Sequence, residues 1–77
     1  MVKGVTAYIL AIVRAGREYS VYDEVKKIKG VVDVSITYGA WDLVIKVQVD
    51  SLPELDRVVS LVRKIKDIEM TTTLIGV

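Results

Sequence analysis

Hydrophobic periodicity changes several times along this chain, and the order of those changes restricts the fold that it can adopt. Apolar residues that alternate or run together are typical of strands, whereas apolar residues spaced three and four apart are typical of helices. The pattern predicts strand, helix, strand, strand, helix and strand, in that order, over residues 5–14, 18–29, 31–38, 41–49, 51–65 and 68–77. With right-handed crossovers, this order predicts an α+β fold of the ferredoxin-like βαββαβ type. Its four-stranded antiparallel sheet has the first and third strands at the centre and both helices on one face.

Local signals mark the ends of the two predicted helices. Gly30 follows the last turn of the first helix, where glycine is favoured as a stop. Ser51 and Glu54 have the spacing of a capping box at the start of the second helix. Pro53 lies in the first turn of that helix, where proline is tolerated.

Strict alternation assigns the side chains of the other strands to two faces of the sheet. The rows expected to face the helices are Val32, Val34, Ile36 and Tyr38, then Trp41, Leu43, Ile45, Val47 and Val49, then Ile68, Met70, Thr72 and Leu74. The polar groups expected on the helix-free face are Asp33, Ser35, Thr37, Asp42, Lys46, Gln48, Glu69, Thr71 and Thr73.

The helix-free face is also expected to be apolar enough to bury. The first strand is apolar on both faces, with one row of Val5, Ala7, Ile9, Ala11 and Val13 and a second row of Tyr8, Leu10 and Ile12. The helix-free face is therefore expected to carry Val44, Ile75 and one of these rows. An uncovered apolar face marks an interface, and 52% of the 77 residues are hydrophobic. We therefore expect a two-fold homodimer packed sheet to sheet, as a dimeric α+β barrel or sandwich.

Missing residue types exclude several function classes. The chain has no Cys, His or Asn, so the usual zinc ligands, thiolate chemistry and the commonest general base are absent. We therefore expect that the protein is not an enzyme and that it binds no metal and no cofactor. The net charge of +1 is mixed in sign, which argues against direct nucleic-acid binding. No apolar run approaches the ~18 residues of a membrane span. A cytoplasmic location is expected, and the few thermolabile residues beside many charged ones are typical of thermophiles.

The segment around Gly39 and Asp42 is the strongest candidate for a binding site. Glycine allows a ligand to approach the main chain, and a carboxylate beside the turn is able to receive an ammonium group. Threonine hydroxyls and turn amides suit a carboxylate, so the outline is that of amino-acid recognition. The alternatives are a plain turn glycine, a carboxylate that pairs with a lysine, and threonines that are only good strand formers.

Two sequence motifs, one after the other along the chain, resemble those of a known family. "IKGVVDVSITYGAWDLVIKV" is similar to a pattern of helix end, Gly-Val, strand, Gly-x-x-Asp and apolar strand, and "MTTTLI" is similar to a Thr-x-Thr-Leu ending. Together they resemble the RAM domain, the C-terminal effector domain of the Lrp/AsnC regulators, over nearly the whole chain.

The resemblance implies a homodimer that assembles further into an octamer or similar ring, with an amino-acid effector bound between dimers. Carried over by position, it implies effector contacts from Gly39, Ala40, Asp42, Thr71 and Thr73, with Tyr38 and Trp41 as possible pocket lining. Family regulators carry an N-terminal helix-turn-helix, whereas this chain begins at the first strand. The expectation is a single RAM-like domain over residues 1–77 without a DNA-binding domain, able to co-assemble with full-length regulators.

Three functions are therefore open from the sequence. The first is an amino-acid-sensing, oligomerising module that modulates transcription through Lrp/AsnC-type regulators. The second is an ACT-like amino-acid-binding module, which has nearly the same fold. The third is a structural assembly domain that binds no ligand. An enzyme of the dimeric ferredoxin-like class would need a buried acid with a raised pKa in a closed cavity.

Overall fold

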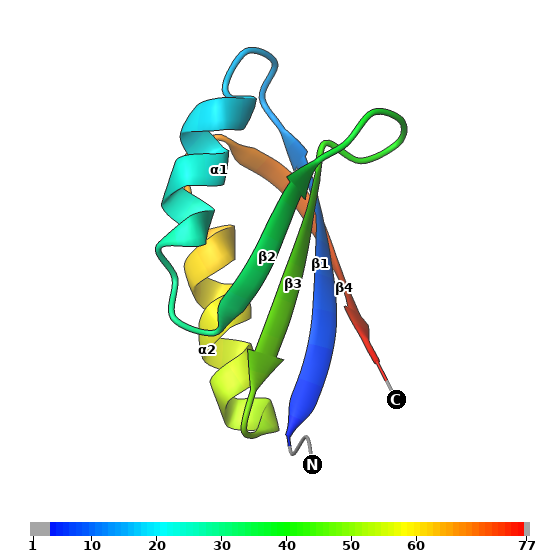
Figure 1. Cartoon of the computed structure of the whole chain (residues 1–77). Helices are drawn as coiled ribbons and strands as arrows, with labels where there is room; N and C mark the ends of the chain where they lie inside the picture. The colour runs from blue at the N-terminus through cyan, green and yellow to red at the C-terminus, as the bar shows by residue number, and fades with distance from the viewer. Residues whose placement is uncertain (1–3, 77) are drawn as a thin grey trace.

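The computed structural model describes residues 4–76 and confirms the predicted fold (Figure 1). The elements are β1 (Val5–Val13), α1 (Glu18–Lys26), β2 (Val31–Ile36), β3 (Leu43–Val49), α2 (Leu52–Arg63) and β4 (Ile68–Ile75). The antiparallel sheet has the strand order β2-β3-β1-β4, so β1 and β3 are central and β2 and β4 are the edges. Figure 1 shows both helices on the same face of this sheet.

The core lies between that face and the helices. Ala7, Ile9 and Ala11 of β1 pair with Val47, Ile45 and Leu43 of β3, and all six side chains are fully buried. The helices cover them with a stripe at helical spacing, as predicted: Val21 and Val25 from α1, and Leu55, Val58 and Val62 from α2. Burial of these side chains is the main favourable term in folding.

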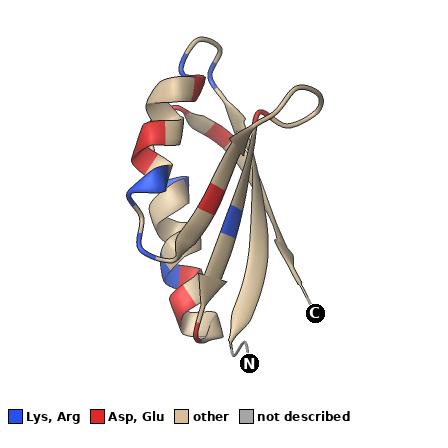
Figure 2. Ribbon diagram, viewed as in Figure 1, with Lys and Arg blue, Asp and Glu red and all other residues tan. Residues whose placement is uncertain are grey.

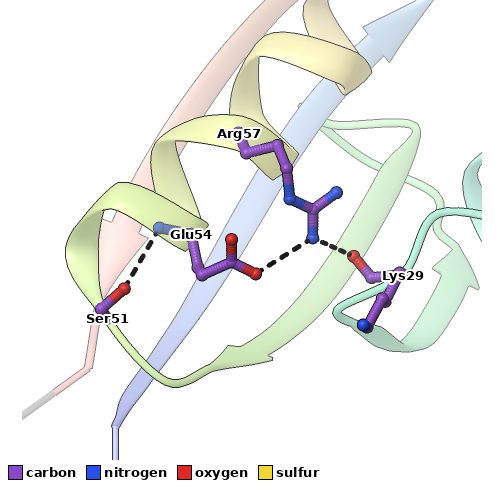
Figure 3. A network of polar contacts seen from close by, with 4 residues as sticks. All are labelled: Lys29, Ser51, Glu54 and Arg57. Carbon is purple, nitrogen blue, oxygen red and sulfur yellow. Dashed lines mark hydrogen bonds and ion pairs between the residues drawn. The ribbon is translucent and has the colours of Figure 1, made fainter.

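The predicted cap of the second helix is confirmed. The Ser51 hydroxyl accepts a hydrogen bond from the Glu54 backbone N–H at 3.4 Å (Figure 3). The Glu54 carboxylate contacts Arg57 at 3.5 Å, and the same guanidinium donates to the Lys29 carbonyl at 3.0 Å. Arg57 therefore ties α2 to the segment between α1 and β2.

The first helix is shorter than predicted, because it ends at Lys26 rather than at Lys29. The backbone then makes two tight turns, with Lys27 N–H donating to the Glu24 carbonyl and Ile28 N–H to the Val25 carbonyl. Ile28 still packs against the core from this turn. Gly30 follows with a positive φ of 105°, which favours glycine.

A bulge in β4 overturns the predicted faces of that strand. Val13 pairs with Ile68, but Ile12 pairs with Met70, so Glu69 is an extra residue opposite β1. The extra residue reverses the alternation that follows it. Ile68 faces the helices as predicted. Beyond the bulge, Thr71, Thr73 and Ile75 lie on the helix side, and Met70, Thr72 and Leu74 lie on the helix-free face.

A second bulge, in β2, turns Val32 away from the helix side, where it was predicted to lie. Val31 pairs with Val47 and Asp33 pairs with Lys46, which leaves Val32 as the extra residue. Val31 takes the place against the core that was expected for Val32, and Val32 is 53% exposed. Val34 and Ile36 face the helices as predicted.

The helix-free face carries the second row of β1, and its apolar part lies over β1, β4 and the middle of β3. Ile75 is absent from this face, contrary to prediction, because of the β4 bulge. We call the helix-free apolar face the set formed by Tyr8, Leu10, Ile12, Val44, Met70 and Leu74. Charged residues gather mainly on the helices and loops, so the strands remain largely uncharged (Figure 2).

Candidate functional site

The turn between β2 and β3 is a loop closed by hydrogen bonds at its base. The Thr37 N–H donates to the Asp42 carbonyl at 2.8 Å, and the Thr37 hydroxyl donates to the Trp41 carbonyl at 2.7 Å. The loop stands out beyond the ends of the strands (Figure 1). The sequence between these anchors therefore forms a projecting tip on a fixed base.

Asp42 fixes this loop to the neighbouring strand. Its backbone N–H donates to the Ala11 carbonyl at 2.9 Å, and its Oδ2 accepts from the Val13 N–H at 2.8 Å. The carboxylate thus extends the pairing of β1 beyond Leu43, the first residue of β3. The prediction had placed this side chain on the helix-free face. It instead lies toward the backbone edge of β1, because Asp42 precedes β3 and strand alternation does not apply to it.

The other predicted residues of the loop are exposed. Tyr38 is fully exposed, and Gly39 and Ala40 beside it are also exposed. Gly39 has a positive φ of 131°. Trp41 is half-buried, but it is not among the residues that form or pack against the core. Tyr38 and Trp41 were predicted to continue the rows that face the helices, but both lie outside the strands, because β2 ends at Ile36 and β3 begins at Leu43.

Thr71 and Thr73 lie in a different place, on the side of the sheet that carries the helices. They line a groove of about 570 Å³ between α2 and the edge strand β4. We call this the α2–β4 groove; its lining residues are Val59, Arg63, Ile68, Glu69, Met70, Thr71 and Thr73. None of the predicted loop residues lines it. Within one protomer, the structure does not bring the loop and the two threonines into one cavity.

Sequence reasoning missed the charged residues of this groove, Arg63 and Glu69. Val59 and Arg63 are four residues apart and so share one face of α2, a signal that the sequence does contain. The position of Glu69 beside them depends on the β4 bulge, for which the sequence offers no local signal.

The described residues form neither a cluster of metal ligands nor a membrane-spanning helix. Residues 4–76 hold no group of three or more His, Cys, Asp or Glu side chains placed to bind a metal ion. No helix within the same residues is long and apolar enough to cross a membrane.

Comparison with known families gives a match over almost the whole chain. A family model described as the Lrp/AsnC ligand binding domain matches residues 6–76. The chain is also 32% identical over 71 residues to the HTH-type transcriptional regulator FL11 of Pyrococcus furiosus. That alignment covers 92% of this chain and 47% of FL11. The chain therefore spans about half the length of the curated relatives it matches.

Solved structures agree with this match. The crystal structure of FFRP-DM1 superposes with a TM-score of 0.90 at 36% identity, and covers 95% of this chain and 99% of that chain. PHS023, a hypothetical protein from Pyrococcus horikoshii, gives a TM-score of 0.89 at 36% identity and covers 95% of this chain and 89% of that chain. The matched family is a ligand-binding domain of transcriptional regulators and not an enzyme, as the sequence led us to expect.

Proposed function

Because this chain belongs to the Lrp/AsnC ligand binding domain family, we propose that it is an oligomerising regulatory domain that binds an amino-acid effector and modulates Lrp/AsnC-type transcription regulators. The observation that carries this proposal is the family match over residues 6–76. The match favours this function over an ACT-like module. A domain that acts on such regulators works in the cytoplasm, which is where we propose that this chain functions.

Dimerisation is proposed to occur through the helix-free apolar face. Met70 and Leu74 are 57% and 51% exposed on this face, and Tyr8 is 37% exposed between them and β3. A 77-residue domain gains stability by burying such a surface. A two-fold arrangement brings the same face of a second copy against it.

The effector is proposed to bind where two dimers meet. One dimer contributes Thr71 and Thr73, and the other contributes the loop that carries Gly39, Ala40 and Asp42, with Tyr38 and Trp41 beside the ligand. This arrangement is supported by the separation of the two sets within one protomer and by the projection of the loop away from the body of the domain. Assembly into an octamer or similar ring would supply these contacts.

The ligand proposal is tested by calorimetric titration of the purified domain with each of the twenty amino acids at millimolar concentration. We expect saturable binding of one amino acid or of a chemically related group, and a change in assembly measured by light scattering at the same concentrations. An effector changes assembly only through different affinities for the two states. Absence of binding across the panel would reject the sensing function.

A structural assembly domain is the second candidate, and the geometry of Asp42 favours it. One carboxylate oxygen of Asp42 already accepts a hydrogen bond from Val13, so the turn has a structural role without any ligand. This candidate predicts co-purification of the domain with a full-length Lrp/AsnC-type regulator, unaffected by any amino acid. The sensing function instead predicts that the bound effector changes the amount of regulator that is retained.

A further inference from the structure

The α2–β4 groove presents charges of both signs to the same space. Arg63 approaches from α2, and Glu69 approaches from β4. Arg63 and Glu69 form no ion pair within 4.0 Å. The ion pairs among residues 4–76 are Arg17–Asp67 and Arg57–Glu54. The groove therefore offers a guanidinium and a carboxylate that are not joined in a contact ion pair.

The bulge in β4 gives Glu69 its place in this groove. Glu69 is the extra residue between the pairs Val13–Ile68 and Ile12–Met70. Bulges turn a side chain away from the direction that regular alternation would give it, and they are common beside functional sites. After the bulge, Thr71 and Thr73 place two hydroxyls in the same groove.

The size and the apolar part of the groove suit a small ligand. Its volume of about 570 Å³ lies inside the ~300–1,000 Å³ range of small-molecule sites. Val59 and Ile68 supply the apolar lining. A guanidinium fork matches the geometry of a carboxylate, and a carboxylate accepts hydrogen bonds from an ammonium group.

We infer that Arg63 and Glu69 recognise the two charged ends of a free α-amino acid. Arg63 binds the carboxylate, Glu69 binds the ammonium group, and the two threonine hydroxyls donate to or accept from these same two charged groups. The apolar lining contacts the ligand side chain. This inference rests on the proposed function, and it adds two recognition residues that lie in the same protomer. The alternative is that both charges are only solvated surface groups.

The experiment uses the amino acid that binds most tightly in the panel, together with its methyl ester and its N-acetyl derivative. The ester lacks the carboxylate charge, and the N-acetyl derivative lacks the ammonium charge. Binding of each compound is measured by calorimetry for the parent chain, Arg63→Gln and Glu69→Gln. The control variants are Lys64→Gln and Glu24→Gln, which remove exposed charges of the same signs outside the groove.

We expect each groove variant to weaken binding of the free amino acid about tenfold or more, the usual effect of losing a charge-assisted hydrogen bond. Arg63→Gln should leave binding of the ester unchanged, and Glu69→Gln should leave binding of the N-acetyl derivative unchanged. A purely structural effect would weaken binding of all three compounds alike, and thermal unfolding checks that each variant is folded. The two control variants should bind like the parent.

Three results would overturn the inference, and they distinguish its failure from the failure of the proposed function. If the parent binds an amino acid and both groove variants bind it equally well, Arg63 and Glu69 do not recognise the ligand, while the proposed function stands. If titration with the amino acid changes amide chemical shifts only in residues 37–42, the ligand binds at the loop and not in the groove, and the proposed function again stands. If the parent binds no amino acid, the proposed function and this inference both fail.

Discussion

Asp42 illustrates how one residue serves the fold at the position where a ligand contact was expected. Its Oδ2 accepts the Val13 N–H at 2.8 Å, and its own N–H donates to the Ala11 carbonyl. A half-buried N–H that loses its acceptor costs free energy, since water replaces the carboxylate only in part. The structural role and a contact through the second carboxylate oxygen are compatible, so the two have to be separated by substitution.

Asp42→Ala is expected to lower the free energy of unfolding by about 1–3 kcal/mol, because it removes the acceptor of the Val13 N–H. Asp42→Asn keeps a side-chain oxygen at the same distance from the backbone and should recover a large part of this loss. Urea denaturation at one fixed protein concentration measures both variants. An Ala variant as stable as the parent would show that the hydrogen bond contributes nothing.

Gly30 and Gly39 both have a positive φ, but their surroundings differ. A Cβ at Gly30 would lie 2.9 Å from the Val49 Cγ1 and 3.0 Å from the Val58 Cγ2, whereas a Cβ at Gly39 would meet nothing within 4 Å. Gly39→Ala should therefore cost about 1–3 kcal/mol from backbone strain alone. Gly30→Ala should cost more, since overpacking of the core adds to the strain. Thermal unfolding of the two variants gives the order, and the reverse order would contradict this account.

At the scale of the elements, the sequence predicted features that depend on near neighbours in the chain. The cap at Ser51 and the stripe of Leu55, Val58 and Val62 were predicted because their signals lie within one or two helical turns. The faces of β4 beyond Glu69 were predicted wrongly, because a bulge depends on pairing with a strand some 55 residues earlier. The same limit separates Thr71 and Thr73, whose types were identified, from Arg63 and Glu69, whose shared groove was not.

The start of α2 offers a test of such a local signal. Ser51→Ala removes the hydroxyl that accepts from the Glu54 N–H and should lower the free energy of unfolding by about 1 kcal/mol. Ser60→Ala is the matched control, because Ser60 is exposed within the same helix and alanine has the higher helix propensity. Chemical denaturation should show a loss for the first variant and no loss for the second. Equal stabilities would mean that the cap does not hold this helix end.

At the scale of the whole molecule, the two faces of the sheet are unequally covered. The helix side buries its six central β1 and β3 side chains completely, whereas the helix-free apolar face leaves Met70 and Leu74 more than half exposed. Such a surface on a domain of this size is typical of a subunit interface. The bulge at Glu69 contributes to this division, because it turns two large apolar side chains of β4 toward the uncovered face and two threonines toward the groove.

A charge on the uncovered face should therefore separate the subunits without unfolding them. Leu74→Lys places an ammonium group in the proposed interface, where burial of an unpaired charge is strongly unfavourable. Leu61→Lys is the control, because Leu61 is an exposed leucine on α2 at 39% exposure. Light scattering at micromolar concentration should give a dimer or larger assembly for the parent and for Leu61→Lys, and a monomer for Leu74→Lys. Circular dichroism should show the same secondary structure in all three. A monomeric parent would reject the sheet-to-sheet dimer, and an undissociated Leu74→Lys would place the interface on another surface.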